Sequence, residues 1–518
     1  MSEAHGSNGG DAAEQGATNG AEQKQELNFL MQARREKLDR LRAAGVEPFG
    51  YSFGRTHTAT EAVAALGSAE EGPEVAVAGR LVSWRSQGKT AFAHLADMDG
   101  RVQLYFRKDD IGEALFAQLG EYDLGDWVGV RGAMMRTRTG EATVKVVHAE
   151  LLSKSLRPLP MGKEQMVDGK VVRYSAFSDT EQRARQRYAD LAVHPEVRAL
   201  FRARSVLTRT IRTHLDSLGY LEVETPVLQP LYGGAAARPF ITHHNTLDMP
   251  LYLRIADELY LKRLIVGGFE RVYEIGHDFR NEGIDRTHNP EFTMLEFYEA
   301  FADYTTMMSR VESLLVSAAE AVRAIPVVGE KVPQLVTPFP RIEWVPSLSK
   351  AAGADVMAIS DAALRTLAER IGVQKVSTLS RPKVLDEMFQ ELVESKIDTP
   401  TFVVDYPKEL SPLAKPKRGG PEGITERFEL FARGKELANA FSELNDPIDQ
   451  RERFEAQAAL RAAGDDEASG VDEDYLRAME YGMPPTGGVG IGIDRLFMYL
   501  TDTQNIRDVI LFPTMRPE

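Results

Sequence analysis

The segment FRNEGIDRTHNPEFTMLEFYE, residues 279–299, joins a charged loop to a stretch that alternates like a β-strand. Side chains two apart in a strand share a face, so Glu296 lies on the same face as Phe292 and Tyr298. The four steps from Phe292 to Glu296 span roughly 13 Å. That is about the length of an adenine ring joined through one phosphate to an amino acid. A half-buried strand with one paired acid is the alternative for this segment alone.

The loop before this strand carries four charged or titratable side chains, which are Arg280, Glu282, Arg286 and His288. Guanidinium groups hold phosphate oxygens in a bidentate fork. They also compensate the negative charge that builds up when a phosphate is attacked. The loop therefore suits phosphate binding, although loops of charges are often only solvated.

A second constellation is ITERFELFARGKELANAFSELND, residues 424–446. If Arg433 and Gly434 form a hairpin turn, Glu429 and Glu436 become diagonal neighbours on one face. Two carboxylates this close repel each other unless a cation lies between them. Mg²⁺ bound together with a nucleotide phosphate is the usual cation for oxygen ligands. A pair of solvated acids is the alternative.

A third constellation is TGGVGIGIDRLFMYL, residues 486–500, with glycines at 487, 488, 490 and 492. Glycine lets another chain or a ligand approach the backbone closely, and Arg495 begins the helix that follows. The spacing does not match the dinucleotide-binding fingerprint, and no Walker sequence is present. Glycines near a strand can also mean only tight packing.

The chain is expected to comprise five segments, and the largest must position these residues. At 518 residues the chain is long enough for two or three domains. We predict a disordered tail over 1–26, an amphipathic helix and connector over 27–71, a barrel over 72–155 and a linker with an insertion (161–179) over 156–195. The large remaining domain, 196–518, mixes helices and strands without a regular βαβ rhythm, which favours an α+β fold with an antiparallel sheet.

The barrel is predicted from five short β-rich runs between residues 75 and 152, separated by turns at Asp99-Gly100 and Thr139-Gly140. This pattern suits an oligonucleotide-binding (OB) fold, although spacing alone does not exclude an SH3-like barrel. The helix before it places Leu30, Leu38 and Leu41 on one face and arginines on the other. That helix could pack on its own domain or grip phosphates.

The amino-acid composition excludes several classes of protein and of functional site. A net charge of -15 argues against non-specific nucleic-acid binding over the whole surface, and the absence of cysteine excludes disulfides, thiolate metal sites and cysteine nucleophiles. No apolar run of about 18 residues and no signal-peptide pattern occur, so we expect a cytoplasmic protein without a membrane partner.

The second and third constellations, together with the opening segment, resemble the signature motifs 2 and 3 of class II aminoacyl-tRNA synthetases. The predicted helix 197–218 and the following GYLEVETPVLQP resemble motif 1, in which Pro226 ends a strand at a homodimer interface. GGAAARPFITHHNTLD, YLRIADELYLKRLIVGGFERVYEIG and IRDVILFPTMRP are similar to bacterial-type class II lysyl-tRNA synthetases. The resemblance runs from about Val75 to the C-terminus.

The resemblance implies a role for each residue of an ATP site. Arg280 would bind the α-phosphate, Arg495 the γ-phosphate, and Phe292 would lie under the adenine. Glu282 and His288 would also contact ATP. The residues implied for the cofactor Mg²⁺ are Glu429 and Glu436, and Glu436 would also contact ATP.

The same resemblance implies a pocket for L-lysine lined by Gly234, Glu258, Arg280, Glu296, Tyr298, Asn439 and Glu443. Lysine brings two ammonium groups, and burying them requires carboxylates. We expect Glu296, Tyr298 and Glu443 at the side-chain ammonium and Glu258 near the α-amino group. The implied reaction forms lysyl-adenylate from lysine and ATP and then transfers lysine to tRNA(Lys). No side chain is an obvious general base for the transfer.

The resemblance gives the barrel an anticodon-binding role. OB folds recognise unstacked bases with aromatic platforms and polar edges. Phe92 would stack on a base, and Arg85, Gln103 and Glu141 would form hydrogen bonds to it. Without the resemblance, a lone phenylalanine in a strand is more often part of the core.

Two other functions are compatible with parts of this pattern. A lysyl-transferring paralogue that modifies a translation factor would lack the barrel, whereas residues 75–152 are present. A non-catalytic RNA-binding homologue would have lost ATP-binding groups, whereas Arg280, Phe292 and Arg495 remain.

Overall fold

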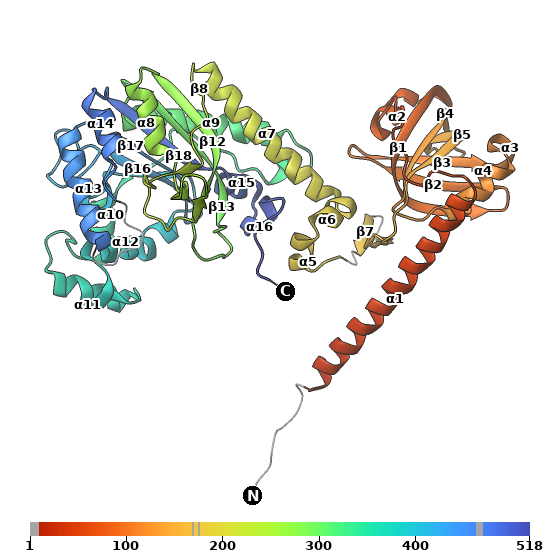
Figure 1. The fold of residues 1–518 in the computed structure, drawn as a ribbon, viewed down its shortest axis with the longest axis horizontal. Coiled ribbons are helices and arrows are strands. Elements are labelled where there is room, and N and C mark those ends of the chain that lie inside the picture. Colours follow the sequence, from red (N-terminus) through yellow and green to blue (C-terminus); the bar gives the residue numbers. More distant parts are fainter. Residues whose placement is uncertain (1–9, 168–169, 175–176, 463–469, 518) are drawn as a thin grey trace, which may run out of the picture. The chain divides into compact units, whose positions relative to one another are not determined.

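The computed structural model describes residues 10–167, 170–174, 177–462 and 470–517. The chain divides into two compact units, residues 1–178 and 179–518 (Figure 1). The division falls inside the segment that the sequence predicts as a linker. Among the helices of the described ranges, none combines the length and the apolar character needed to cross a bilayer.

Five strands of the first unit form a closed barrel in the order β1-β2-β3-β5-β4, which confirms the predicted barrel. Their bounds are β1 Glu71–Gln87, β2 Thr90–Ala96, β3 Arg101–Arg107, β4 Trp127–Arg136 and β5 Ala142–Ser153. Side chains alternate along β2, so Ala91, Ala93 and Leu95 enter the barrel core and the residues between them face outward. The two predicted turns connect β2 to β3 and β4 to β5.

The remaining described elements of this unit are helices α1 Gly10–Ala43, α2 Ala59–Leu66, α3 Lys108–Ile111 and α4 Glu113–Gln118 and strands β6 Lys163–Val167 and β7 Lys170–Tyr174. β6 and β7 pair as an antiparallel hairpin within the predicted insertion. Residues 168–169 and 175–176 of that insertion lie outside the described residues.

Helix α1 begins at Gly10, whereas the sequence predicts a disordered tail up to residue 26. No proline interrupts residues 10–43, so the helix continues without a stop signal. Residues 1–9 of the predicted tail lie outside the described residues. Leu38 and Leu41 are buried as expected, but Leu30 is 41% exposed because only the C-terminal part of the helix lies against the barrel.

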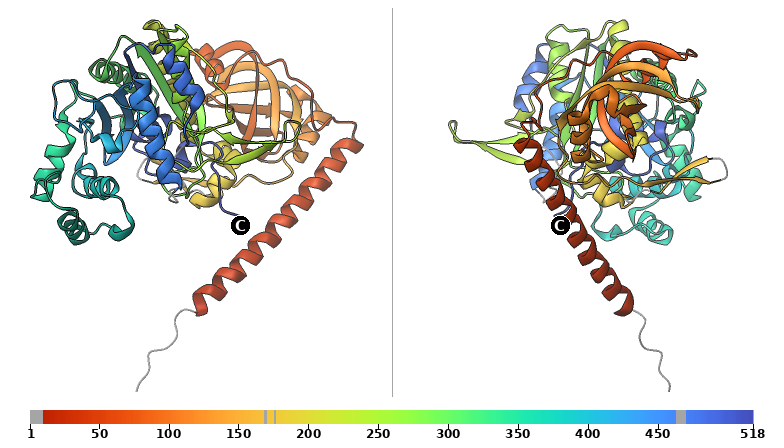
Figure 2. Two further views of the ribbon diagram at one scale, coloured as in Figure 1. Left: turned by 60° about the vertical axis from the view of Figure 1, so that its left-hand side comes forward. Right: turned by 90° about the vertical axis from the view of Figure 1, so that its right-hand side faces the viewer.

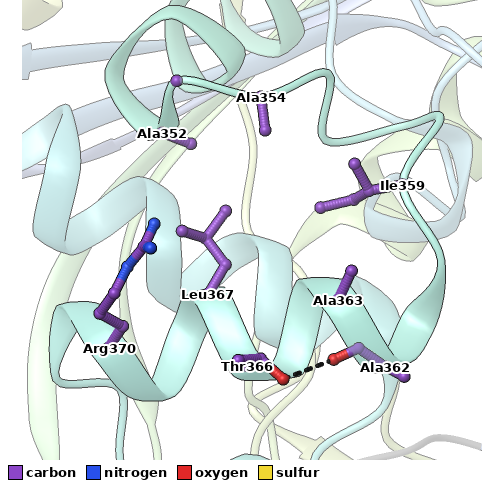
Figure 3. A pocket seen from close by; sticks show the side chains of 9 residues that line it. Ala352, Ala354, Ile359, Ala362, Ala363, Thr366, Leu367 and Arg370 are labelled. Carbon is purple, nitrogen blue, oxygen red and sulfur yellow. Dashed lines mark hydrogen bonds between the residues drawn. The ribbon is translucent and has the colours of Figure 1, made fainter.

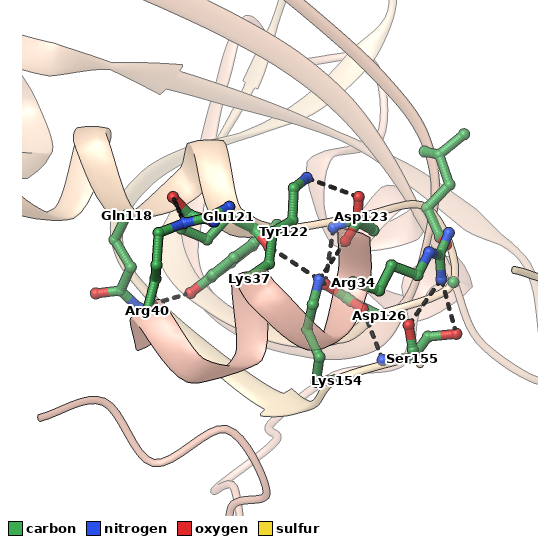
Figure 4. A network of polar contacts seen from close by, with 12 residues as sticks. Arg34, Lys37, Arg40, Gln118, Glu121, Tyr122, Asp123, Asp126, Lys154 and Ser155 are labelled. Atoms are coloured by element: carbon green, nitrogen blue, oxygen red, sulfur yellow. Dashed lines mark hydrogen bonds and ion pairs between the residues drawn. The ribbon is translucent and has the colours of Figure 1, made fainter. Parts of the chain in front are cut away.

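The basic face of α1 packs on its own domain, which is one of the two alternatives that the sequence left open for this helix (Figure 4). Lys37 forms an ion pair with Asp123 at 2.8 Å, and Arg40 forms one with Glu121 at 2.9 Å. These contacts use the cationic side chains to dock the helix.

The second unit is built on an eight-stranded sheet in the order β14-β15-β16-β17-β18-β13-β12-β8. The bounds are β14 Arg341–Glu343, β15 Thr401–Val404, β16 Arg427–Ala432, β17 Lys435–Ser442, β18 Thr486–Gly492, β13 Glu291–Ala300, β12 Arg271–Phe279 and β8 Leu221–Glu222. The central pairs are antiparallel, and the two edge pairs, β14–β15 and β12–β8, are parallel. This confirms the α+β prediction.

Helices cover both faces of this sheet (Figure 1). Their bounds are α5 Thr180–Arg185, α6 Arg187–Val193, α7 Pro195–Ser217, α8 Glu258–Val266, α9 Tyr304–Arg323, α10 Trp344–Ala352, α11 Asp361–Ile371, α12 Arg381–Leu392, α13 Pro447–Ala462, α14 Glu473–Glu480, α15 Ile493–Thr501 and α16 Ile506–Val509. Helices α7, α9 and α15 share the main core with Leu295 and Phe297 of β13. Helix α8 packs on the opposite face, against Tyr298.

The predicted strand that ends at Pro226 is interrupted. Only β8 and the two-residue strand β9, Leu228–Gln229, flank this proline. Proline has no N–H to donate to a sheet, so the pairing stops before it. β9 instead pairs with β11, Met249–Leu253, which forms a hairpin with β10, Ile241–His244. Figure 2 shows this hairpin projecting from the second unit, and residues 241–244 are all exposed.

Candidate active site and anticodon-binding face

Strand β13 separates the core from the candidate site. Leu295 and Phe297 lie in the main core, so Glu296 and Tyr298 point to the opposite face. Both are almost fully buried, at 5% and 3% exposure. The Tyr298 hydroxyl donates to Glu296 Oε2 at 2.9 Å, and the backbone N–H of Asp257 donates to Oε1 at 3.4 Å. The strand is therefore buried on both faces here, and the half-buried alternative does not hold.

Glu258 and Glu443, which are far apart in sequence, meet at a residue that the sequence analysis missed. Lys262 of α8 forms ion pairs with Glu258 Oε1 and with Glu443 Oε2. All three side chains are buried, and the Lys262 ammonium also lies 5.2 Å from the centre of the Phe441 ring. Glu258 and Lys262 are four residues apart, the spacing that places two side chains on one helix face. This spacing could have identified Lys262 as a partner of Glu258 from the sequence.

Two glycines make room for these carboxylates. A Cβ at Gly488 would lie 2.0 Å from Glu443 Oε1 and 2.4 Å from the Tyr298 ring. A Cβ at Gly234 would lie 3.3 Å from Glu258 Cβ, and its φ of +90° favours glycine in any case. The glycine-rich strand β18 therefore allows a close approach, as predicted, and the approaching groups are pocket side chains.

The carboxyl groups of this cluster are shifted toward their neutral forms. Burial, followed by the charges of Asp278 and Glu258, raises the pKa of Glu296 to about 8. Burial also raises the pKa of Glu443 well above its usual value, although Lys262 opposes the shift. Strongly shifted carboxyl groups in one buried cluster are typical of a functional site.

The charged loop and β13 place the predicted phosphate-binding groups together. The Arg280 guanidinium lies 5.1 Å from the centre of the Phe292 ring. His288 Nε2 lies 3.1 Å from Arg495 Nη2, so motif 2 and motif 3 residues meet. Glu282 is exposed in the same loop.

The predicted hairpin of β16 and β17 turns at Arg433-Gly434. Strand β17 has a bulge at the residue that follows Glu436. Glu429 and Glu436 remain diagonal neighbours, and each is held by an arginine. Arg427 pairs with Glu429, and Arg495 lies 3.3 Å from Glu436. Burial and the charge of Glu436, against the opposing effect of Arg427, leave the pKa of Glu429 at about 7.

These two carboxylates fit Mg²⁺ as a partial ligand set. Mg²⁺ usually keeps several waters and binds one or two carboxylates together with substrate phosphates. Within the described ranges, no group of three or more acidic, histidine or cysteine residues could hold a metal by itself. The arrangement therefore suits an ion that arrives with a nucleotide. Asn439, opposite Glu429 in the hairpin, accepts a hydrogen bond from Arg427 Nε at 3.1 Å.

A second buried acidic group surrounds Arg254 and was also missed. Arg254 contacts Asp257 at 2.9 Å, Glu274 at 2.6 Å and Asp278 at 3.4 Å. Burial, with the charge of Asp278 next, raises the pKa of Asp257 to about 10. The group lies beside Glu296, whose Oε1 accepts from the Asp257 backbone.

On the barrel, Phe92 lies on the outward face of β2 and is half-buried, outside the barrel core. It contacts the Tyr105 ring at 4.9 Å, and the Arg85 guanidinium lies 5.7 Å from its centre. The core alternative for Phe92 therefore does not hold.

Two of the three polar residues predicted beside Phe92, Gln103 and Glu141, belong to one network. Gln103 donates to Glu141 Oε2 at 2.6 Å, and Thr143 donates to Gln103 Oε1 at 2.7 Å, which orients the amide. His94 Nε2 lies 2.8 Å from Glu141 Oε1, and its Nδ1 lies 2.7 Å from Ser83 Oγ. Sequence reasoning missed His94, although it lies two residues after Phe92 and therefore on the same strand face.

The hollow drawn in Figure 3 lies elsewhere. It has a volume of about 440 Å³ and is lined by α10, α11 and the segment between them. Its lining is mostly alanine, leucine and isoleucine, with Arg370 as its charged residue. None of the predicted site residues lines it, so it offers no competing active site.

Comparisons with known proteins agree with this geometry. The family described as tRNA synthetases class II (D, K and N) matches residues 179–516, and the OB-fold nucleic acid binding domain family matches residues 75–152. The chain therefore belongs to the class II aminoacyl-tRNA synthetases of the D, K and N group.

Within that group it is a member of the lysine–tRNA ligase family. It is 52% identical to the lysine–tRNA ligase of Moorella thermoacetica over 495 residues, which cover 95% of this chain and 98% of the relative. The lysine–tRNA ligases of Pelotomaculum thermopropionicum and Enterococcus faecalis are 51% and 50% identical. Each alignment covers 95% of this chain, and 96% and 98% of the respective relative.

Proposed function

We propose that this protein activates L-lysine with ATP and transfers it to the 3′ end of tRNA(Lys). The observation that carries this proposal is the buried cluster of three carboxylates, Glu258, Glu296 and Glu443, at the end of the strand that bears Phe292. Lysine supplies the two ammonium groups that such a cluster accommodates. The full-length similarity to lysine–tRNA ligases supports the same substrate.

In the first step, the lysine carboxylate attacks the α-phosphorus of ATP. A new bond forms between the carboxylate oxygen and phosphorus, and pyrophosphate leaves. Arg280 stabilises the charge on the α-phosphate, Arg495 and His288 hold the far end of the triphosphate, and Phe292 supports the adenine. Catalysis then depends on position and charge, without a covalent bond to the protein.

Mg²⁺ is the proposed cofactor, held by Glu429 and Glu436 together with the phosphates of ATP. When bound, it would neutralise charge on those phosphates. Tyr406 and Arg427 hold Glu429 in place through hydrogen bonds to its two oxygens. Arg495, the proposed γ-phosphate ligand, lies 3.3 Å from Glu436, the proposed metal ligand, which supports this arrangement.

In the second step, a hydroxyl of the terminal adenosine of tRNA(Lys) attacks the lysyl carbonyl and AMP leaves. The barrel is proposed to bind the anticodon. Phe92 offers a face for stacking, and Gln103 and Glu141 offer a donor and an acceptor to a base edge. A homodimer and a cytoplasmic location are proposed from membership of the family.

The test is pyrophosphate exchange with each of the twenty amino acids, followed by charging of purified tRNA(Lys). We expect lysine to drive exchange best and tRNA(Lys) to be charged. Exchange driven best by another amino acid would overturn the pocket assignment. Lysine-dependent exchange without charging of tRNA(Lys) would favour an acceptor other than tRNA.

A further inference from the structure

We propose that Lys262 is a positioning residue that sets the charge of the lysine pocket to match a dication. This inference rests on the proposed function and adds a residue to it. The side chain bridges one carboxylate of α8 and one that follows β17, so it links two elements that are separate in sequence. Its own exposure is 0%.

The charges of the four buried side chains determine which ligand they suit. In the ionised forms that a bound dication favours, Glu258, Glu296 and Glu443 bring three negative charges, and Lys262 brings one positive charge. The difference is two negative charges, which equals the two ammonium groups of free lysine. A buried charge is costly unless it is paired, so an amino acid with one ammonium group would leave one carboxylate uncompensated. Lys262 thereby contributes to specificity without contacting the reacting atoms.

The contacts of Lys262 also select which carboxylate oxygens remain available. Lys262 pairs with Glu258 through Oε1 and with Glu443 through Oε2. Neither buried carboxylate oxygen of Glu443 has a hydrogen-bond partner among the described residues, and it is Oε2 that forms the ion pair with Lys262. The other oxygen, Oε1, lies beside the position where Gly488 lacks a side chain. An unpartnered carboxylate oxygen next to Tyr298 is a suitable acceptor for a substrate ammonium.

The other groups around the cluster do not supply the missing positive charge. Burial raises the pKa of Glu258, and Lys262 and then Arg427 of β16 oppose this shift, but Arg427 is paired with Glu429. Tyr298 and Tyr475 approach from β13 and α14, and both are neutral at ordinary pH because burial raises the pKa of each. Asp257 and Asp278 lie near Glu296 and share Arg254 with Glu274. Burial raises the pKa of Asp257 to about 10, so this acid adds no negative charge at neutral pH.

A simple helix-stabilising ion pair is the competing explanation for Lys262. Such a pair would involve Glu258 alone, at the i, i+4 spacing, and would contribute only to stability. The second contact, with Glu443, distinguishes the two explanations. The barrel contains a matched case in Lys154, which is equally buried and bridges Asp123 and Asp126 far from the pocket residues in sequence.

The experiment measures lysine-dependent pyrophosphate exchange by the full-length protein and its Lys262→Met, Lys262→Gln and Lys262→Arg variants. Loss of the charge in the Met and Gln variants should raise the lysine KM roughly tenfold or more while changing the ATP KM little. The carboxyl groups would ionise less readily, so the pH at which the lysine KM is lowest should rise by about one unit. Lys262→Arg should restore both values in part.

Lys154→Met is the matched control, and it should leave the lysine KM and its pH profile unchanged. Thermal unfolding of each variant separates folding defects from pocket defects. An unchanged lysine KM and pH profile in a folded Lys262→Met or Lys262→Gln variant would overturn the inference. Failure of the wild-type protein to exchange with lysine would instead overturn the proposed function.

A measurement on the wild-type protein covers the case in which no charge-free variant folds. 1,5-diaminopentane carries two ammonium groups, and 1-aminopentane carries one. If the pocket has two uncompensated negative charges, the diamine should inhibit lysine-dependent pyrophosphate exchange roughly tenfold more strongly than the monoamine. Equal inhibition would contradict the charge count.

Discussion

Each unit of this protein buries one lysine between two carboxylates, and the two clusters differ in how their charge is balanced. In the barrel, Lys154 lies 2.5 Å from Asp123 and 2.8 Å from Asp126 (Figure 4). In the catalytic unit, Lys262 pairs with Glu258 and Glu443. Both lysine side chains are fully shielded from solvent.

The barrel cluster is neutral as a whole. Lys37 of α1 pairs with Asp123, so two acids face two ammonium groups. Asp126 also accepts hydrogen bonds from the backbone N–H groups of Asp123 and Ser155. Burial alone would raise the pKa of Asp123, but hydrogen bonds from Lys154 and Lys37 outweigh it and lower the pKa below its usual value. This cluster fastens α1 and the end of β5 to the barrel.

The pocket cluster carries an excess of negative charge. Glu296 accepts hydrogen bonds only from neutral donors, the Tyr298 hydroxyl and the Asp257 N–H. The pKa of Glu443 is raised even though it contacts Lys262, first because of burial and also because Glu258 is close. A cluster that serves the fold balances its own charge, whereas a cluster left with excess charge is suited to a ligand of opposite charge.

The largest expected effect is at Glu443. Glu443→Gln should raise the lysine KM roughly hundredfold, about 3 kcal/mol, because it removes a buried partner of an ammonium group. The ATP KM should change little in the same exchange assay. Glu299→Gln is the control, since Glu299 is a buried acid on the same strand that pairs with Arg271 and Arg310. An unchanged lysine KM in Glu443→Gln would remove this residue from the pocket.

In the barrel, the corresponding change should reduce stability and leave catalysis intact. Asp126→Asn should destabilise the first unit by about 2 kcal/mol, because Lys154 loses one of its two charged partners. Hydrogen exchange measured on barrel peptides checks this result, and the lysine KM in pyrophosphate exchange should stay at the wild-type value. A raised lysine KM would show that the two clusters are not independent.

The proposed barrel function can be separated from its stability at Phe92. Phe92→Ala should lower kcat/KM for charging tRNA(Lys) roughly tenfold, because one stacked base contributes about 1–3 kcal/mol. Pyrophosphate exchange should be unaffected, since adenylate formation does not involve the anticodon. Equal losses in both assays would mean that Phe92 acts only through folding.

The smallest expected effect is the pH dependence of lysine binding. Glu296 has a pKa raised to about 8, and only its ionised form accepts an ammonium ion. The lysine KM should therefore fall roughly fivefold as the pH rises from about 7 to 8, before the amino groups of lysine begin to lose their protons. The ATP KM, measured alongside, should not follow this trend. A lysine KM that is flat over the same range would contradict the assignment of Glu296.

Much of this molecule could be predicted from its sequence because local patterns reflect local physics. Alternation and turn residues predicted the five-stranded barrel and placed Glu296 and Tyr298 on one face of β13. The Arg433-Gly434 turn predicted the hairpin that brings Glu429 and Glu436 near each other. The sequence predicts a disordered tail up to residue 26, whereas helix α1 begins at Gly10, because composition does not measure how far a helix extends.

Only the tertiary structure decided which charged side chains share a site. Lys262 and Glu443 are separated by about half of the second unit in sequence, and their contact depends on how α8 packs against β12 and β13. The structure also revealed that Gly488 gives space to Glu443 and that His94 lies beside Glu141. Sequence spacing specifies faces of helices and strands, whereas burial and long-range packing decide which of those faces meet, and therefore where charge is left uncompensated.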